Sequence, residues 1–329
     1  MSKSTSSYRK TDSQQYSSPV EYAMRCPNLW LFFLCSFLIF YLCKYDEWIT
    51  TEHELVLNKR LQTFQKLFPS SAGSEANPFD SVTTERRLNL HYPYDENSNN
   101  GRIQKNIWQM WKNPPSDEHF PYKPLHKKWI DMNPNFKYHF QTNADVDQII
   151  YDEFKDTVPE IPHALDLLPS IILKADFSRY VLLFLYGGTY ADLDINLEIP
   201  IDDWFDTNRN VSFVAGLEGD NNVNPTLPRR CQIETWFFKS KARHPVLRKL
   251  IATIVRQTFE NYEKNMEPDF GNKKGSAICH SVSVMDWTGP ALFTDVLWTH
   301  LNSLKNPVIV DTDPNRWNLG HDVVSSPYV

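Results

Sequence analysis

Cysteine is scarce in this sequence, and it contains no long basic run and no internal repeat. Five cysteines occur among 329 residues, and the formal net charge is −6. Cys26, Cys35 and Cys43 lie in or at one apolar segment, where small apolar packing is their expected role. Cys231 and Cys279 remain as a possible disulfide, which their spacing alone does not decide. Without a basic block, nucleic acid is excluded as a partner.

Aromatic residues and prolines are plentiful. Aromatic residues make up 14% of the chain, and prolines number 22. This composition suits a loop-rich enzyme whose cleft is lined by aromatic side chains on which a ring-shaped ligand can stack. After removal of the N-terminal region, the length leaves one domain that is long enough for a large core.

An uncharged apolar segment near the N-terminus predicts a membrane anchor. Residues 26–43 contain no charge over 18 residues, enough to span a thin bilayer. Basic residues precede the segment and acidic residues outweigh one lysine after it: Lys3, Arg9, Lys10 and Arg25, then Asp46, Glu47, Glu52 and Glu54 against Lys44. This asymmetry predicts a cytosolic tail at residues 1–25 and a lumenal domain. The alternative is a cleaved signal peptide, but no small-x-small cleavage pattern follows the apolar core.

Residues 44–100 are predicted to form a lumenal stem and linker ahead of a domain at residues 101–329. Residues 48–68 place apolar side chains at roughly helical spacing, which suits either a solvated amphipathic stem or a surface that pairs with a partner. Residues 69–100 are rich in Ser, Asn and Pro, which is typical of a linker. Asn210 begins the only acceptable glycosylation sequon, so we expect it on the lumenal side.

Short apolar runs bounded by turn residues predict the elements of the domain. Strands are expected at 103–108, 136–140 and 211–216, and helices at 125–131 and 245–262. Alternating strands and helices favour an α/β fold with a mostly parallel sheet. Ligands of such sheets bind beyond the carboxyl ends of the strands.

The strongest chemical signal is the pair Asp192 and Asp194 on a predicted strand. Alternate strand residues share a face, so Tyr190, Asp192, Asp194 and Asn196 are expected on one side. Two neighbouring carboxylates repel each other and are costly to desolvate, so a bound cation explains their placement. Hard oxygen ligands favour Mg²⁺ or Mn²⁺ over Zn²⁺. The pattern therefore predicts a divalent metal that holds a diphosphate.

The Asp-x-Asp spacing alone is a weak signal, because it occurs twice more. Asp145 and Asp147 open a helix-like stretch, where Asp caps backbone amides, and Asp311 and Asp313 precede a proline turn. The pair at positions 192 and 194 differs from these two pairs in the helix that precedes it.

That preceding helix is predicted to be buried and yet carries charges. Ser170 is its expected N-cap, and Gly187 or Gly188 its stop. Asp176 and Arg179 lie three residues apart on one helical face. One interpretation is an internal ion pair that fixes the helix. The other is a site in which Asp176 accepts hydrogen bonds from sugar hydroxyls and Arg179 supports sugar or phosphate oxygens.

Two stretches resemble a known family. Ile-Leu-Lys-Ala-Asp-Phe-Ser-Arg-Tyr at 172–180 and Gly-Gly-Thr-Tyr-Ala-Asp-Leu-Asp at 187–194 are similar to the donor-binding motif of the Och1/Hoc1-like fungal α-1,6-mannosyltransferases, in glycosyltransferase family 32. Segments 106–112, 241–248 and 285–290 agree in order and spacing. The similarity spans about residues 85 to 300 and is nearer to the Hoc1-like members.

The resemblance implies a GT-A fold, a single mixed α/β sheet that binds a nucleotide sugar at its strand ends. The catalytic residues expected on this basis are Asp176, Arg179, Asp192 and Asp194, and the last two are the metal ligands. The expected donor contacts are Trp108, Gln109, Tyr180, Gly188 and Tyr190.

The acceptor side is expected at two places. Glu218 and Asp220 follow a predicted strand, where they either orient the acceptor hydroxyl or form a polar loop. Tryptophans are more often core residues than sugar platforms. Trp287 is taken as an exception, because Thr288 and Gly289 lead into a proline turn that can bring the ring to a ligand.

The activity implied by the resemblance is transfer of mannose from GDP-mannose to an N-glycan or mannan acceptor, with an α-1,6 linkage, retention of configuration and Mn²⁺ or Mg²⁺ as cofactor. The short anchor and the resemblance together indicate a single-pass type II protein of the Golgi membrane that forms a complex with other mannosyltransferases.

Two other functions stay open at this point. Family members continue for several tens of residues with a late His as a metal ligand, whereas this chain ends at Val329 and offers His321. The protein is therefore either an active transferase or a weak or inactive subunit of a mannan polymerase complex. A lectin-like membrane protein that only holds glycans is the third alternative.

Overall fold

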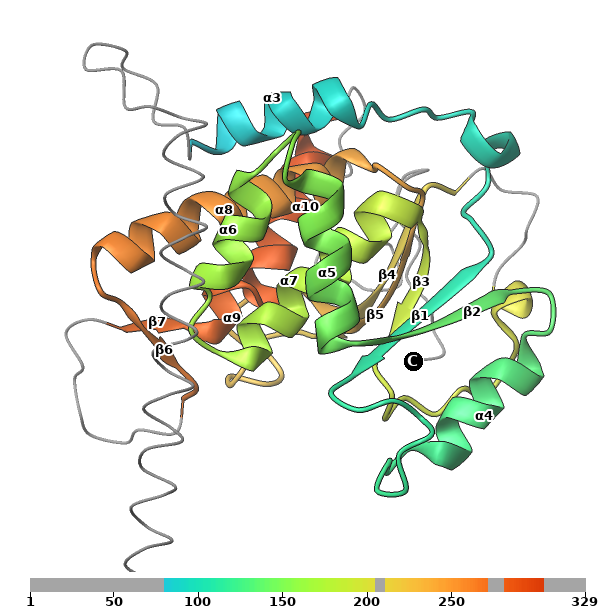
Figure 1. Cartoon of the computed structure of the whole chain (residues 1–329). Coiled ribbons are helices and arrows are strands. Elements are labelled where there is room, and N and C mark those ends of the chain that lie inside the picture. The colour runs from blue at the N-terminus through green and yellow to red at the C-terminus, as the bar shows by residue number, and fades with distance from the viewer. Residues whose placement is uncertain (1–79, 205–210, 272–280, 305–329) are drawn as a thin grey trace, which may run out of the picture. The chain divides into compact units, whose positions relative to one another are not determined.

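A mixed sheet of five strands lies at the centre of the part of the chain that the computed structural model describes, residues 80–204, 211–271 and 281–304 (Figure 1). The strand order is β2-β1-β3-β5-β4. The bounds are β1 Asn106–Trp111, β2 Lys137–Thr142, β3 Gly188–Ala191, β4 Phe213–Gly219 and β5 Gln232–Ser240. β1 is parallel to β2 and β3, whereas β5 is antiparallel to β3 and β4. The carboxyl ends of β2, β1 and β3 therefore meet at one edge of the sheet.

Helices cover both faces of the sheet, with α4 on one side and the larger group on the other (Figure 1). Their bounds are α3 Ser81–His91, α4 Lys123–Met132, α5 Asn143–Phe154, α6 Glu160–Leu167, α7 Ile171–Tyr186, α8 Pro245–Glu263, α9 Val284–Trp287 and α10 Pro290–Ser303. Short 3₁₀ turns at Ser98–Gly101 and Ile201–Asp203 and a parallel strand pair, β6 Glu267–Asp269 with β7 Ser281–Ser283, complete the described elements.

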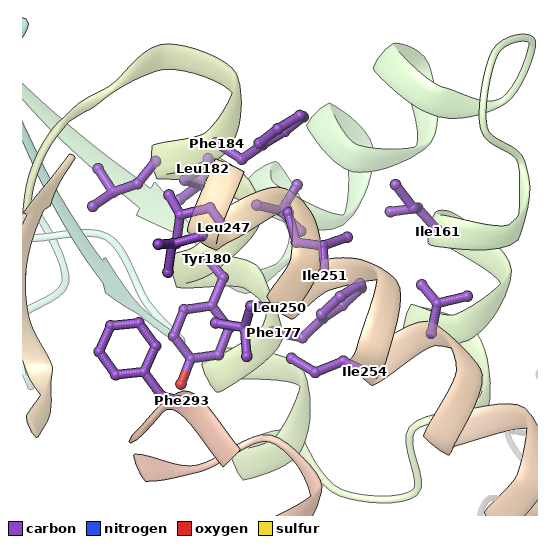
Figure 2. Close-up of a cluster of buried hydrophobic side chains, with 14 of the residues drawn as sticks. Ile161, Phe177, Tyr180, Leu182, Phe184, Leu247, Leu250, Ile251, Ile254 and Phe293 are labelled. Atoms are coloured by element: carbon purple, nitrogen blue, oxygen red, sulfur yellow. The ribbon is translucent and has the colours of Figure 1, made fainter. Parts of the chain in front are cut away.

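The larger apolar core lies between the sheet and the larger helix group, and α7 runs through it. Figure 2 shows Phe177 and Tyr180 of α7 beside Leu250 and Ile254 of α8 and Phe293 of α10, all fully buried. Full burial of one such side chain contributes about 1.5–3 kcal/mol. Because α7 leads directly into β3, this packing holds the amino end of that strand in place.

Both predicted ends of α7 are confirmed. Ser170 Oγ accepts a hydrogen bond from the backbone amide of Leu173 at 3.4 Å and caps the first turn. Gly187 ends the helix with a φ of +64°. A Cβ at Gly187 would collide with the Gln104 side chain and the Ala242 backbone, so this position requires glycine.

A smaller core on the α4 side of the sheet holds the chain that follows β3. Its buried members are Ile107, Trp129, Ala191, Leu197, Ile201, Trp204 and Phe237. The indole Nε1 of Trp129 donates to the carbonyl of Ile195 at 2.9 Å, and the Ile201 amide donates to Asn133 Oδ1 at 2.8 Å. These bonds fix the segment that follows Asp194 to α4 and to the turn after it.

Three features differ from the prediction. β3 ends at Ala191 instead of continuing through Asn196, so Asp192 and Asp194 lie beyond the strand. β5 was not predicted, and its antiparallel pairing makes the sheet mixed instead of mostly parallel. α3 falls within the stretch interpreted as a linker, yet its Leu88 is fully buried and the helix packs against α8. The other predicted strands and helices each overlap an observed element: β1, β2, β4, α4 and α8.

Asp145 has the capping role predicted for it. Thr142 is the N-cap of α5, and its Oγ1 accepts from the Asp145 amide at 3.2 Å, while the Asp145 carboxylate accepts from the Thr142 amide at 2.8 Å. Hydrogen bonds from the side chain and backbone of Thr142 lower the pKa of Asp145. This second Asp-x-Asp sequence therefore has a structural explanation.

Several predictions lie outside the described residues: the anchor at 26–43, the helical stem at 48–68, Asn210, Cys279, the pair at 311 and 313, and His321. Cys231 is buried. Within the described ranges, no helix has both the length and the apolar character needed to cross a membrane.

Candidate active site

A cavity of about 370 Å³ opens at the sheet edge where the carboxyl ends of β1, β2 and β3 meet. We call it the strand-end cavity. Its lining residues are Met110, Trp111, Lys112, Tyr122, Asn143, Ile171, Ile172, Ala175, Arg179, Tyr190, Asp192, Leu193 and Asp194. Both aspartates thus lie at the carboxyl end of a parallel strand, where a ligand site was predicted.

Asp192, directly after β3, is held through its backbone amide and one carboxylate oxygen. Its backbone amide donates to the carbonyl of Trp236 at 2.8 Å, which continues the β3–β5 pairing for one residue. Its Oδ1 accepts from the Tyr190 hydroxyl at 2.6 Å and lies 3.7 Å from Nη2 of Arg179. The side chain still keeps 32% exposure, so it reaches the cavity. The backbone and one oxygen of Asp192 are therefore preorganised, and the carboxylate remains accessible.

Asp194 is the more open of the two carboxylates. It lies in a turn in which the Ile195 amide donates to the Asp192 carbonyl at 3.3 Å, and its side chain is exposed. Among the described residues, it has no hydrogen bond or ion pair. A carboxylate of this kind is available for an external ligand.

Arg179 and Asp176 form a buried pair beneath the cavity. Nη2 of Arg179 lies 2.9 Å from Oδ1 of Asp176, and Nη1 donates to the carbonyl of Thr235 at 2.9 Å. The other Asp176 oxygen accepts from the Thr288 hydroxyl at 3.0 Å. Burial raises the pKa of Asp176 to about 6, although Arg179 and Thr288 act in the opposite direction. The ion pair of the first interpretation is therefore present, and Arg179 alone of the two residues lines the cavity.

Gln109 fixes the Asp192 backbone from the neighbouring strand. It is fully buried, its Nε2 donates to the Asp192 carbonyl at 3.2 Å, and its Oε1 accepts from the Tyr138 hydroxyl at 2.6 Å. Gln109 does not line the cavity. It therefore acts through Asp192 instead of touching a ligand.

The donor set fits a hard divalent cation. Mg²⁺ and Mn²⁺ sites commonly use one or two carboxylates together with substrate phosphate oxygens and water. Asp192 and Asp194 provide two carboxylates at the wall of a cavity, and the oxygens of Asp194 are unpartnered within the described ranges. No group of three or more His, Cys, Asp or Glu side chains in that part of the chain is arranged so that it could hold a metal ion. The remaining ligands of such a cation would come from water or from a bound substrate.

Trp108 and Gly188, two predicted donor contacts, do not line the cavity. Trp108 is 4% exposed in the larger core, donates from Nε1 to the Gly187 carbonyl at 3.0 Å and stacks on His139 with ring centroids 4.0 Å apart. Gly188 has a φ of +112°, and a Cβ there would collide with Asn106. Both residues shape β1 and β3 instead of reaching the cavity.

Tyr180, Trp287, Thr288 and Gly289 also lie away from the cavity. The Tyr180 hydroxyl donates to the Thr288 carbonyl at 2.8 Å in the larger core. Trp287 is 1% exposed and donates from Nε1 to a threonine hydroxyl of α8 at 3.1 Å. Gly289 is the N-cap of α10. The tight turn is present, but it turns Trp287 into the core.

A second cavity, of about 380 Å³, adjoins the first, and Asp194 lines both. We call it the bulge cavity. Its lining residues are Trp129, Asp194, Ile195, Asn196, Leu197, Glu198, Ile199, Trp204, Leu217, Glu218, Glu234, Trp236 and Phe237. Glu218 is thus at a cavity wall. Asp220 lies in the following loop, where it accepts from the Asn222 amide at 2.9 Å and stands 3.8 Å from Arg230.

Several cavity residues were not predicted. Ile171 and Ile172, in the first turn of α7, are 58% and 50% exposed, which is unusual for the start of a buried helix. An apolar pair directly after the Ser170 cap could have indicated a ligand face. Tyr122 and Glu234 carry no comparable signal, because neither stands in a motif and β5 was not predicted.

Comparisons with known proteins confirm the resemblance seen in the motifs. The chain matches the family described as "Glycosyltransferase sugar-binding region containing DXD motif" over residues 122–211. It is 32% identical over 255 residues to an initiation-specific alpha-1,6-mannosyltransferase of Candida albicans, an alignment that covers 72% of this chain and 63% of that protein. It is 27% identical over 274 residues to the putative glycosyltransferase HOC1 of Saccharomyces cerevisiae, covering 82% of this chain and 63% of that protein.

Among solved structures, the PaToxG glycosyltransferase matches with a TM-score of 0.40 and 13% identity, covering 77% of this chain and 82% of that chain. The chain spans 63% of the length of each of the two curated relatives named above.

Proposed function

We propose that this chain, which belongs to the glycosyltransferases whose sugar-binding region contains a DXD motif, is a mannosyltransferase of GT-A fold that uses GDP-mannose as donor. The observation that carries the proposal is that Asp192 and Asp194 line one cavity with Arg179 at the carboxyl ends of parallel strands. The mannosyl group and the α-1,6 linkage come from the names of the relatives.

The lining of the strand-end cavity suits the two chemical parts of a nucleotide sugar. Lys112 and Arg179 supply positive charge for phosphate oxygens. Trp111, Tyr122 and the exposed Ile171 supply apolar surface for the flat base. A ligand with a charged diphosphate and a flat ring requires positively charged side chains next to an apolar surface, and this cavity has both.

Asp192 and Asp194 would hold Mn²⁺ or Mg²⁺, and the bound cation would supply Lewis-acid stabilisation of the leaving diphosphate, an effect worth several kcal/mol. The protein's own contribution is preorganisation. Tyr190 and Gln109 orient Asp192 before any ligand arrives, and Arg179 adds a buried positive charge beside it. Burial lowers the pKa of Arg179, but Tyr190, Asp192 and Asp176 raise it by more, so the guanidinium stays charged.

The transfer that we propose retains the configuration of the sugar. The bond from the mannosyl C1 to the diphosphate oxygen breaks, and the acceptor hydroxyl oxygen forms a bond to C1 on the same face. The hydroxyl proton leaves with the diphosphate. Arg179 lines the cavity 3.7 Å from Oδ1 of Asp192 and would stabilise the negative charge that develops on the leaving diphosphate.

We propose a Golgi membrane location with the described domain in the lumen, and an N-glycan or mannan acceptor. The support is the uncharged segment at residues 26–43 with its charge asymmetry, and the kinship to mannosyltransferases. Complexes with other mannosyltransferases are part of the same proposal, and the apolar residues of the stem are the candidate contact.

The experiment is metal-dependent release of GDP from GDP-mannose by the purified protein, with manno-oligosaccharide as acceptor. We expect Mn²⁺-dependent turnover that Asp194→Asn lowers by at least about 10²-fold. A protein that neither binds GDP-mannose with Mn²⁺ nor releases GDP would contradict the enzyme proposal. Manno-oligosaccharide binding that ignores both metal and nucleotide would support a lectin instead.

A further inference from the structure

The bulge cavity is set between the segment after Asp194 and the strands β4 and β5. Asp194 belongs to its wall and to the wall of the strand-end cavity. The two cavities therefore meet at one of the two motif carboxylates. A molecule in the bulge cavity would lie next to the proposed reaction centre without occupying the donor's place.

An irregular stretch of β5 shapes this cavity. Ala215 of β4 pairs with Phe238 of β5, and Leu217 pairs with Ile233. The two positions on β4 are thus closer in sequence than their partners on β5, so the extra residues of β5 form a bulge. The bulged backbone also serves the neighbouring site, since the Trp236 carbonyl accepts from Asp192. Bulges of this kind redirect side chains next to active sites. Here the bulge carries Glu234 and Trp236 to the cavity wall.

Glu234 is the unusual residue of this wall. It is 2% exposed, and its Oε1 has no hydrogen-bond partner in the part of the chain that the structure describes. Gly216 leaves room for it, because a Cβ there would overlap the Glu234 carboxyl group. A buried, unpartnered carboxyl oxygen at a cavity wall is costly unless a ligand satisfies it.

The charge state of Glu234 allows both donation and acceptance. Burial, and after it the charge of Glu218, raises the pKa of Glu234 to about 8, while the backbone amide of Gly216 acts in the opposite direction. Burial also raises the pKa of Glu218, which accepts a hydrogen bond from Gln232 at 2.7 Å. A neutral carboxylic acid beside a carboxylate is a good match for hydroxyl groups, which donate and accept.

The composition of the wall does not favour an anionic ligand. No lysine, arginine or histidine is among its lining residues, whereas the strand-end cavity has Lys112 and Arg179. Three tryptophans line the bulge cavity, and Trp236 is the most accessible of them. Aromatic faces with a few converging polar groups suit an uncharged polar ring.

We propose that the bulge cavity binds the acceptor sugar, with the hydroxyl groups of a pyranose on Glu218 and Glu234 and its apolar face on Trp236. This inference rests on the proposed function and adds the acceptor site to it. Glu234 is then a positioning and specificity residue for the acceptor. It brings the attacking hydroxyl to the side of Asp194, where both cavities meet.

The test measures binding of the acceptor and binding of the donor separately in the full-length protein. The variants are Glu234→Gln and Glu218→Gln, and the matched control is Glu263→Gln at an exposed position of α8. GDP-mannose binding with Mn²⁺ is measured by calorimetry, and the probe acceptor is α-1,6-mannobiose. Binding of the mannobiose is followed by tryptophan fluorescence with GDP and Mn²⁺ present. Its KM is measured from the rate of mannosyl transfer from GDP-mannose.

We expect Glu234→Gln to weaken mannobiose binding and to raise its KM by about tenfold or more, with donor affinity unchanged within twofold. Glu218→Gln should act in the same direction, and Glu263→Gln should have no effect. Unchanged mannobiose binding in both cavity variants, with donor binding intact, would overturn this inference alone. Weakened Mn²⁺ binding in Glu234→Gln would overturn it too, because the carboxyl pair would then be a cation site. If the unmodified protein does not bind GDP-mannose, this result would instead contradict the proposed function.

Discussion

The hydroxyl of Tyr190 donates a 2.6 Å hydrogen bond to Oδ1 of Asp192, two residues further along the chain. The guanidinium of Arg179 lies over the Tyr190 ring, 5.0 Å from its centroid, and 3.7 Å from the same Asp192 oxygen. One carboxylate oxygen is therefore fixed by a neutral donor and a cation. The orientation of Asp192 toward the cavity depends on residues that precede it in α7 and β3.

Tyr190→Phe should weaken Mn²⁺ binding in the presence of GDP-mannose. The substitution removes only the donor to Oδ1, and loss of a residue that orients a metal ligand typically costs 10- to 100-fold in affinity or activity. Calorimetric titration of Mn²⁺ measures this effect. The matched control is Tyr262→Phe, since Tyr262 is 58% exposed on α8. Equal Mn²⁺ affinity in both variants would show that the Tyr190 bond does not orient the site.

Gln109→Leu should lower the free energy of unfolding by about 1–3 kcal/mol. The Tyr138 hydroxyl loses its acceptor and the Asp192 carbonyl loses its donor, and both groups lie in a partly buried region. Urea unfolding measures the change. Gln148→Leu, at an exposed position of α5, is the control and should stay within about 0.5 kcal/mol of the unmodified protein. An equally small change in the free energy of unfolding for Gln109→Leu would mean that water replaces the hydrogen bonds of Gln109.

Arg179→Met should destabilise the fold by about 3–5 kcal/mol, because it leaves the buried carboxyl group of Asp176 without its ion partner. The double variant Asp176→Asn with Arg179→Met should recover part of that loss. Arg256→Met provides the control, since it breaks a surface pair with Glu260 that is worth about 0.5 kcal/mol or less. If the double variant were no more stable than Arg179→Met, Asp176 would not be the source of the cost.

The stability of the protein should depend on pH through Glu234. Its folded-state pKa of about 8 lies above the ordinary value of 4.5, because burial disfavours the charged form. The stabilisation from a neutral Glu234 is complete below pH 4.5 and is lost as the pH rises from 4.5 to 8, since the unfolded state gives up this proton first. The Glu234→Gln variant does not show this loss of stability with rising pH, because a glutamine side chain does not ionise.

The measurement is the free energy of unfolding of Glu234→Gln minus that of the unmodified protein, in EDTA, between pH 5 and pH 8. The difference should rise with pH by up to about 1.4 kcal/mol per pH unit. The contribution of Asp176, which is not among the groups that shift the pKa of Glu234, cancels in this difference, whereas Glu218 interacts with Glu234 and contributes to it. A difference that stays flat across the range would show that Glu234 is ionised in the folded protein at pH 5.

Local signals were predictable from the sequence. Ser170 caps α7, Gly187 ends it and Asp145 completes the capping box of α5, and each of these roles depends on residues within four positions. The position of Asp192 and Asp194 at a strand end followed from the same kind of signal. Here the prediction needed only the Gly-Gly break and the apolar run before it.

Contacts across the sheet were not predictable in this way. Trp108 and Gln109 are neighbours on β1 and so face opposite sides, but the sequence does not say which side carries the ligand. Trp108 joins the larger core, and Gln109 reaches the Asp192 backbone. Glu234 depends on the bulge in β5, which arises from pairing with two other strands. Its role could be inferred only after those strands were in place.

Electron paramagnetic resonance of Mn²⁺ in the presence of GDP-mannose tests the central claim most directly. If Asp192 and Asp194 hold a cation that bridges to the donor diphosphate, the full-length protein binds one equivalent of Mn²⁺ only when the nucleotide sugar is present. Asp194→Asn should weaken that binding by at least about tenfold, because it removes the open carboxylate of the pair. Equal Mn²⁺ binding by the unmodified protein and by Asp194→Asn would contradict the account.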